Sequence, residues 1–79
     1  MIIKILGSGC SNCKKLEHNT RKAVEELRID AQIIKVQNPV EIMSYRILST
    51  PALVINGKIC IAGRVAKTKE IKEILNAIP

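Results

Sequence analysis

The 79-residue sequence predicts an α/β fold in which three helices flank a four-stranded mixed sheet. Three observations predict it. An apolar run at residues 2–6 is followed directly by a long amphipathic helical pattern, a second helix start separates two further strand-like segments, and Asn56-Gly57 joins two apolar runs. The resulting order is βαβαββα, in which a right-handed crossover makes the first two strands parallel and the hairpin supplies an antiparallel pair.

The first strand and the first helix are adjacent in the chain. The segment Ile2–Leu6 is apolar apart from one lysine, which is typical of a strand. From about Ser11 to Arg28, apolar and small residues recur at helical spacing and charged residues occupy the other face. The predicted inner positions of this helix are Cys13, Leu16, Thr20, Ala23, Val24 and Leu27.

An edge strand and a second helix are expected next. The segment from Ala31 to Val36 is rich in Ile and Val but contains interspersed polar residues, as an edge strand does. Asn38 followed by Pro39 and Glu41 is a helix start with a capping side chain, a first-turn proline and an early acid. We expect this helix to reach about residue 48. Its predicted inner stripe is Val40, Met43 and Ile47.

The C-terminal third predicts a hairpin and a final helix. Residues 52–55 are apolar at every position, which indicates burial on both faces of the sheet. Asn56-Gly57 then connects them to a strand at residues 59–62, because Asn-Gly between apolar runs favours a two-residue hairpin turn. The final helix begins near Lys67 or Thr68. Its apolar positions are Ile71, Ile74, Leu75 and Ile78.

Length and composition indicate a single domain over residues 1–79, with an aliphatic core because Phe and Trp are absent. A hydrophobic content of 47% excludes a disordered chain. No basic leader or membrane-spanning run is evident, so we expect a soluble, cytoplasmic protein with no membrane partner. The net charge of +6 comes from 13 basic residues interleaved with seven acids. With one aromatic ring, this pattern favours a solvated surface, or attraction to acidic proteins, over a nucleic-acid partner.

Cys10 and Cys13 carry the clearest chemical signal. They enclose Ser-Asn, follow the small-residue loop 7–9, and stand at the start of the first helix. Such a pair can close a small disulfide ring, and the unpaired amides and positive dipole end of the helix lower the pKa of the first thiol. Cys10 is therefore the predicted nucleophile. The third cysteine, Cys60, lies in an apolar strand and is expected to be a buried, inert thiol.

This order of elements, with the cysteine pair after strand one and Thr50-Pro51 before strand three, resembles the thioredoxin fold at its minimal, glutaredoxin-like size. The resemblance covers the whole chain. It is greatest to the small redox-active disulfide proteins, whose Gly-x-Gly-Cys-x-x-Cys loop is matched by Gly7, Gly9, Cys10 and Cys13.

The resemblance implies a cis peptide bond at Pro51, packed beside the cysteine pair, and an extended substrate segment held by the Thr50 backbone. Gly9 and Gly63 are the other candidate substrate-binding residues, and Gly63 is read equally well as an ordinary turn glycine. Gly9 stands where ordinary thioredoxins have Trp, and Ser-Asn replaces their Gly-Pro between the cysteines. The start of the last helix lacks the acidic pair common in glutaredoxins that bind glutathione.

We therefore expect a thiol-disulfide oxidoreductase of thioredoxin or glutaredoxin type. The Cys10 thiolate attacks a substrate disulfide, and Cys13 resolves the mixed disulfide. The expected partners are disulfide-containing protein substrates and an electron donor, either a thioredoxin-reductase-type protein or a low-molecular-weight thiol. The cycle needs no metal or organic cofactor.

Two alternatives remain open from the sequence. The same cysteine pair suits Cu(I) or Zn, as in small βαββαβ metal carriers. Against this, Ser8 stands where that family usually has Met, a helix follows the second strand, and the chain ends in a helix. The other alternative is a non-catalytic partner-binding domain in which the cysteines only sense redox state.

Overall fold

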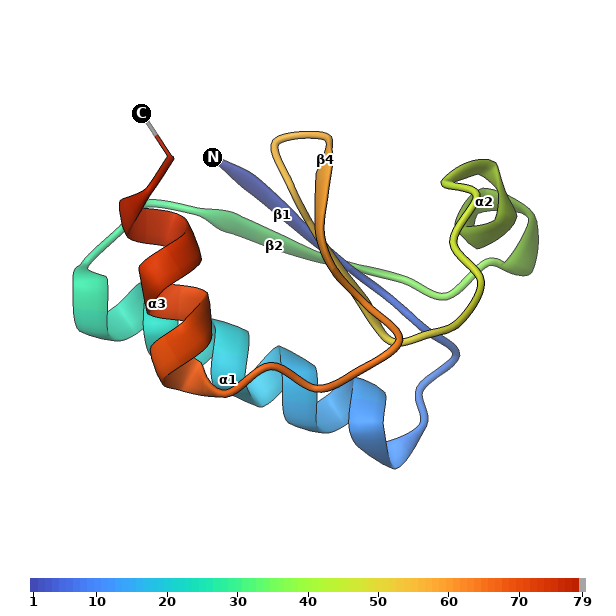
Figure 1. The fold of residues 1–79 in the computed structure, drawn as a ribbon, viewed down its shortest axis with the longest axis horizontal. Coiled ribbons are helices and arrows are strands. Elements are labelled where there is room, and N and C mark those ends of the chain that lie inside the picture. Colours follow the sequence, from blue (N-terminus) through green and yellow to red (C-terminus); the bar gives the residue numbers. More distant parts are fainter. Residues whose placement is uncertain (79) are drawn as a thin grey trace.

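The computed structural model describes residues 1–78 and has the predicted order of elements, βαβαββα (Figure 1). The bounds are β1 (Ile2–Leu6), α1 (Ser11–Leu27), β2 (Gln32–Val36), α2 (Pro39–Ser44), β3 (Ala52–Ile55), β4 (Lys58–Ala62) and α3 (Thr68–Asn76). No helix within the described part of the chain is both long and apolar enough to cross a membrane.

The four strands form one mixed sheet in the order β2-β1-β3-β4. β1 pairs with β2 in parallel and with β3 in antiparallel, and β3 and β4 form the antiparallel hairpin. β2 is an edge strand, as its interspersed polar residues predict. All four residues of β3 are buried, which confirms the prediction that this segment is covered on both faces.

Helices α1 and α3 lie on the same face of the sheet (Figure 1) and enclose the larger core. This core is almost wholly aliphatic, as the lack of Phe and Trp requires. Its members are Ile3, Ile5, Leu16, Ala23, Leu53, Ile55, Ile61, Ala66, Ile71 and Leu75. A smaller cluster on the other face contains Leu6, Val36, Ala52 and Val54. The segment around α2 covers this second cluster.

The predictions for α2 were partly wrong. The helix ends at Ser44 instead of near residue 48. Arg46 follows with a left-handed backbone (φ 58°). Val40 and Met43 are 76% and 74% exposed, so they do not form an inner stripe. Ile42 packs on the smaller cluster instead, together with Tyr45 and the predicted Ile47.

The Asn56-Gly57 hairpin is confirmed, and both residues have the positive φ values, 49° and 84°, that a type I′ turn needs. Further along, Val54 pairs with Ile59 but Leu53 pairs with Ile61. Cys60 is therefore the extra residue of a β-bulge. Cys60 is half-buried on the edge strand β4, where it packs against the larger core. The prediction of a buried thiol was therefore wrong.

Candidate functional site

Cys10 occupies the N-cap position of α1, directly after the loop that leaves β1. Its backbone is extended, with φ −68° and ψ 168°, and the backbone N–H of Cys13 donates to the Cys10 Sγ at 3.3 Å. The first amides of a helix have no partner within the helix, and Ser, Thr, Asp or Asn usually accepts from them. Here the sulfur does so, which places its charge where the helix stabilises an anion.

The two thiols of the pair differ in exposure and in pKa. Cys10 is exposed and Cys13 is 6% exposed, and both are free thiols. The pKa of Cys10 is lowered, first by a hydrogen bond from the Cys13 thiol and then by the backbone N–H of Cys13. Burial raises the pKa of Cys13, and its hydrogen bond to Cys10 raises it further. Cys10 is thus the thiol that ionises first and that a substrate can reach.

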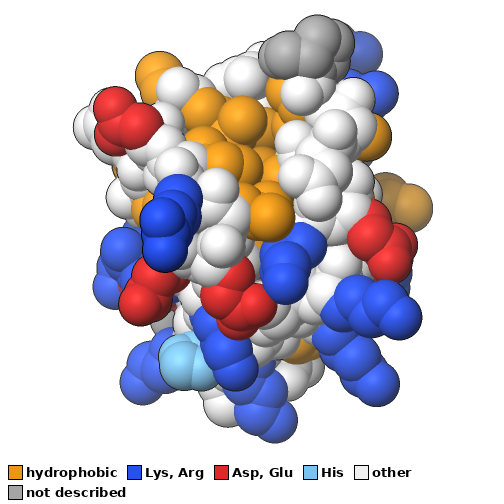
Figure 2. Space-filling view, turned by 90° about the vertical axis from the view of Figure 1, so that its left-hand side faces the viewer, with side chains coloured by type: hydrophobic (Ala, Val, Ile, Leu, Met, Phe, Trp, Pro, Cys, Tyr) orange, Lys and Arg blue, Asp and Glu red, His pale blue; other side chains and the backbone are white. Residues whose placement is uncertain are grey.

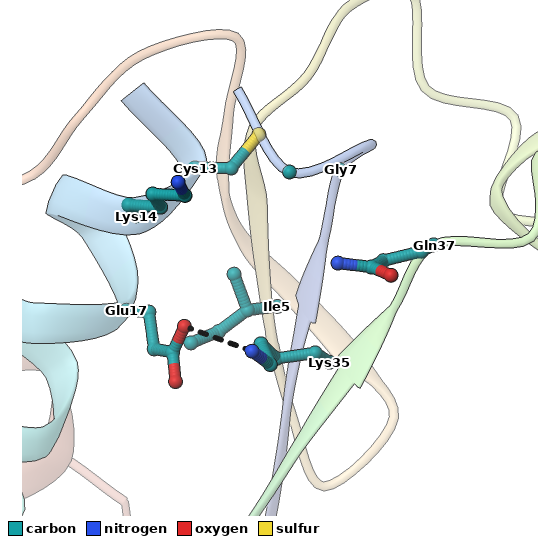
Figure 3. A pocket seen from close by; sticks show the side chains of 8 residues that line it. Ile5, Gly7, Cys13, Lys14, Glu17, Lys35 and Gln37 are labelled. Carbon is teal, nitrogen blue, oxygen red and sulfur yellow. Dashed lines mark ion pairs between the residues drawn. The ribbon is translucent and has the colours of Figure 1, made fainter. Parts of the chain in front are cut away.

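Gly7 belongs to the site because a side chain there has no room. A Cβ added to Gly7 would overlap the Sγ of Cys13, and it would lie 3.9 Å from the Cα of Pro51. In Figure 3 the Cys13 sulfur points toward Gly7. From the sequence, Gly7 was predicted only as part of the loop pattern and not as a site residue. The signal that could have selected it is its position at the end of the apolar strand, immediately before the cysteine loop.

Pro51 and Gly63 lie next to each other, near the contact between Gly7 and Cys13. The Thr50–Pro51 peptide bond is cis, the isomer that the resemblance implies, and Pro51 is fully buried. The Gly63 N–H donates to the Pro51 carbonyl at 2.9 Å. Gly63 has φ 79°, and a Cβ there would collide with the Oγ of Ser49. Gly63 therefore approaches the loop before β3 closely, while Thr50 is exposed beside it.

A small cavity of about 40 Å³ adjoins Cys13 (Figure 3). Its lining residues are Ile5, Gly7, Gly9, Cys13, Lys14, Glu17, Lys35 and Gln37. The volume exceeds the ~10–15 Å³ that one water needs, and several lining side chains are polar. Gly9 has φ 85°, which favours glycine at this corner.

Glu17 places a carboxylate at the same cavity as Cys13. It pairs with Lys35 at 3.7 Å across the gap between α1 and β2, and with Arg21 at 3.0 Å along the helix. Neither Glu17 nor Lys35 was predicted as a site residue from the sequence. The available signal was spacing, since Glu17 follows Cys13 by four residues and so lies on the same side of the helix.

The cysteine pair stands apart from other metal-binding side chains. Within residues 1–78, no three residues of the types His, Cys, Asp and Glu gather as a group of potential ligands. A soft metal at this site would have only Cys10 and Cys13 as protein ligands. The backbone N–H of Cys13, which donates to the Cys10 Sγ, stabilises a thiolate at Cys10.

Comparison with known proteins gives a consistent result. A family model described as "Thioredoxin domain" matches residues 1–76. A protein named thioredoxin from Methanothermobacter thermautotrophicus is 45% identical over 76 residues, which cover 96% of this chain and 99% of that protein. A second protein named thioredoxin, from Methanocaldococcus jannaschii, is 39% identical over 77 residues, which cover 98% of this chain and 88% of that protein.

Proposed function

Because the chain belongs to the thioredoxin family, a family of thiol-disulfide oxidoreductases, we propose that it exchanges protein disulfides at Cys10 and Cys13, with Cys10 as nucleophile. The observation that carries this proposal is the asymmetry of the pair. The exposed thiol has the lowered pKa, and the buried thiol has the raised one.

In the first step the Cys10 thiolate attacks one sulfur of a substrate disulfide. A bond forms between Cys10 and that sulfur, and the other substrate sulfur leaves as a thiolate. Cys13 then loses its proton and attacks the Cys10 Sγ. The Cys10–Cys13 disulfide forms, the second substrate thiolate leaves, and two electrons have passed from the protein to the substrate.

The resolving step depends on deprotonation of Cys13. The charge on Cys10 contributes to the raised pKa of Cys13, and that charge disappears once Cys10 is in the mixed disulfide. The Cys13 thiol therefore becomes more acidic at the moment when it must react. Glu17 lines the same cavity and can take up the proton through water.

The substrate segment is proposed to lie along Thr50, Pro51, Gly9 and Gly63. Thr50 is exposed beside the buried Pro51, and the two glycines leave the neighbouring backbone without side chains. An extended peptide can therefore approach Cys10 closely.

The proposed partners are disulfide-containing proteins and a donor of electrons, either a thioredoxin-reductase-type protein or a low-molecular-weight thiol. We propose the cytoplasm as the compartment, because a protein that reduces disulfides works where thiols are kept reduced. The carrier alternative has less support, because the chain has the order βαβαββα and the small metal carriers have βαββαβ.

The test uses single cysteine variants in a cell extract. Cys13→Ser should attack target disulfides but leave the mixed disulfide unresolved, so covalent complexes that dithiothreitol dissolves should accumulate. Cys10→Ser should trap none through this site, and Cys60→Ser serves as the matched control with unchanged turnover. If neither site variant traps a partner while both lose copper or zinc affinity equally, the carrier is the correct function.

A further inference from the structure

Four lysines without acidic partners lie on one flank of the site. Lys14 and Lys15 are exposed near the start of α1, and Lys67 and Lys69 are exposed around the start of α3. None of the four makes an ion pair within residues 1–78. We call these four residues the basic flank.

One lysine of each half, Lys15 and Lys67, borders the seam between α1 and α3, and Lys14 lies toward β2 beside the cavity at Cys13. The side-chain amide of Asn19 donates to the Ala66 carbonyl at 2.9 Å. Asn19 follows Lys15 by one helical turn, and Ala66 directly precedes Lys67. With a rise of about 1.5 Å per residue, Lys15 lies about 8 Å and Asn19 about 14 Å from Cys10 along the α1 axis. The basic flank therefore extends from the site along the seam.

Two of the three carboxylates near the basic flank are paired with basic side chains. Glu17 pairs with Arg21 and Lys35, and Glu70 accepts two hydrogen bonds from the Arg64 guanidinium. The third, Glu73, lines a hollow together with Lys67, Lys69, Arg64 and Glu70, where three bases outnumber two acids. The first turn of α1 contains no acid. The remaining acids lie at the far end of α1, after it or on α2, and are Glu25, Glu26, Asp30 and Glu41.

Figure 2 faces the end of the molecule where α1 ends. There, Lys and Arg side chains lie mostly in the lower part of the view, with Asp and Glu side chains between them and hydrophobic side chains above. At the other end of α1, Lys14 and Lys15 follow Cys10 by four and five residues, and the first turn contains no acid. An approaching polypeptide thus meets a positive field near Cys10, which attracts acidic groups and repels basic ones.

We propose that the basic flank makes the protein select disulfides whose cysteines have Asp or Glu a few residues away. This inference rests on the proposed function. The proposed substrate segment passes Gly63, and the chain leads from Gly63 to Ala66 and Lys67, which border the seam near Asn19. An extended peptide advances about 3.3–3.6 Å per residue, so side chains two to four residues from the substrate cysteine can reach this part of the basic flank. Single exposed ion pairs contribute little, but several acting together on one segment give a measurable preference.

The experiment compares three synthetic peptides with the same internal disulfide and with flanks of Glu, Gln or Lys. The reduced protein is mixed with each peptide in excess, and the rate of peptide reduction is measured as Cys10 and Cys13 become oxidised. At low salt the Glu peptide should react about tenfold faster than the Gln peptide, and the Lys peptide should be slowest. In 0.5 M NaCl the Glu:Gln ratio should fall below about twofold, because salt screens exposed charges.

Charge variants assign the effect. The test variant changes all four lysines of the basic flank to Gln, and the control changes Arg28, Arg46 and Lys58, which are exposed away from the seam and the site, to Gln. The Glu:Gln ratio should approach one in the test variant and stay within about twofold of the original in the control. Both rates in the ratio are measured with the same variant, so any effect of the lysines on the reactivity of the Cys10 thiolate cancels. Far-ultraviolet circular dichroism checks that both variants are folded.

Two results overturn the inference: equal rates for the three peptides, or a Glu preference that survives in the test variant. In both cases the proposed function stands, because disulfides are still reduced. If none of the peptides is reduced, the proposed function itself fails, and the selectivity falls with it.

Discussion

At the scale of single residues, identical thiols acquire different chemistry from their position. Cys10 and Cys13 are one helical turn apart, yet one caps the helix in solvent and the other is buried against Gly7. The largest cause of the lowered Cys10 pKa is the hydrogen bond from the Cys13 side chain. The thiol that we propose as the resolving one therefore also adjusts the pKa of the thiol that we propose as the nucleophile.

Replacing the Cys13 thiol should raise the pKa of Cys10. Cys13→Ala removes the side-chain donor, so the rise of Cys10 alkylation with pH should shift to higher pH. Cys13→Ser keeps a donor at that position and should shift it less. The measurement is the pH profile of iodoacetamide labelling with mass mapping, in a Cys60→Ser background that leaves one thiol to follow. An unchanged profile in the Ala variant contradicts this account.

Gly7→Ala should slow the resolving step. Its Cβ would overlap the Cys13 sulfur, so the thiol must move away from its place beside Cys10. We expect longer-lived mixed disulfides, measured by quenching the reaction in acid. Gly57→Ala is the matched control, because Gly57 has φ 84° and no neighbour near the added Cβ. It should lower stability by about 1–2 kcal/mol through backbone strain, with the chemistry of the thiols unchanged.

At the scale of elements, α2 is the segment where helix periodicity misidentified the buried face. Val40 and Met43 have the same i,i+3 spacing as Ile42 and Tyr45, so periodicity alone does not distinguish the two pairs. Ile42 and Tyr45 are the pair that packs on the smaller cluster. Which pair does so depends on how the short helix is oriented against the sheet.

Substitutions on α2 should separate the two faces. Val40→Ala should change the free energy of unfolding by less than about 0.5 kcal/mol, because the side chain is mostly exposed. Ile42→Ala removes packed atoms from the smaller cluster and should cost about 1–2 kcal/mol. Urea unfolding of the two variants measures both values. A larger loss of unfolding free energy for Val40→Ala than for Ile42→Ala would support the inner stripe that periodicity predicted.

Local signals predicted most of the fold, and contacts between distant segments account for the remainder. The Asn38 cap, the Asn56-Gly57 turn and the α1 periodicity each lie within a few residues of what they determine. The position of Cys10 at the start of α1 was predicted from the neighbouring residues in the same way. The contact between Gly7 and Cys13 and the Glu17–Lys35 pair depend on how the loop and β2 lie against α1. Periodicity within one element carries no information on such distances.

At the scale of the whole molecule, positive charge exceeds negative charge, with 13 basic and seven acidic residues. Within residues 1–78, four ion pairs use some of this charge, and all involve partly exposed side chains. The remaining like charges repel one another across a small, compact protein. The positive field that favours acidic partners therefore opposes the stability of the folded state.

Salt should stabilise the protein at neutral pH. Raising NaCl from about 10 mM to about 150 mM shortens the Debye length from about 30 Å to about 8 Å, which screens the net repulsion more than it weakens the exposed pairs. We expect Tm to rise in calorimetry at pH 7. Near pH 9.6, the isoelectric point of the sequence, the net charge vanishes and the rise should disappear. A fall in Tm at pH 7 would mean that the ion pairs dominate.

The bulge in β4 gives this strand one residue more than its pairing with β3 uses. Cys60 is the extra residue, and Ile61 after it pairs with Leu53 and enters the larger core. Deleting Cys60 would give a regular hairpin in which Ile59 still pairs with Val54 and Ile61 still pairs with Leu53. If the strand instead became regular with Cys60 in place, Cys60 would pair with Leu53 and Ile61 would turn toward the opposite face. Position 60 can therefore change in residue type or be lost without changing which side chain of β4 enters the core.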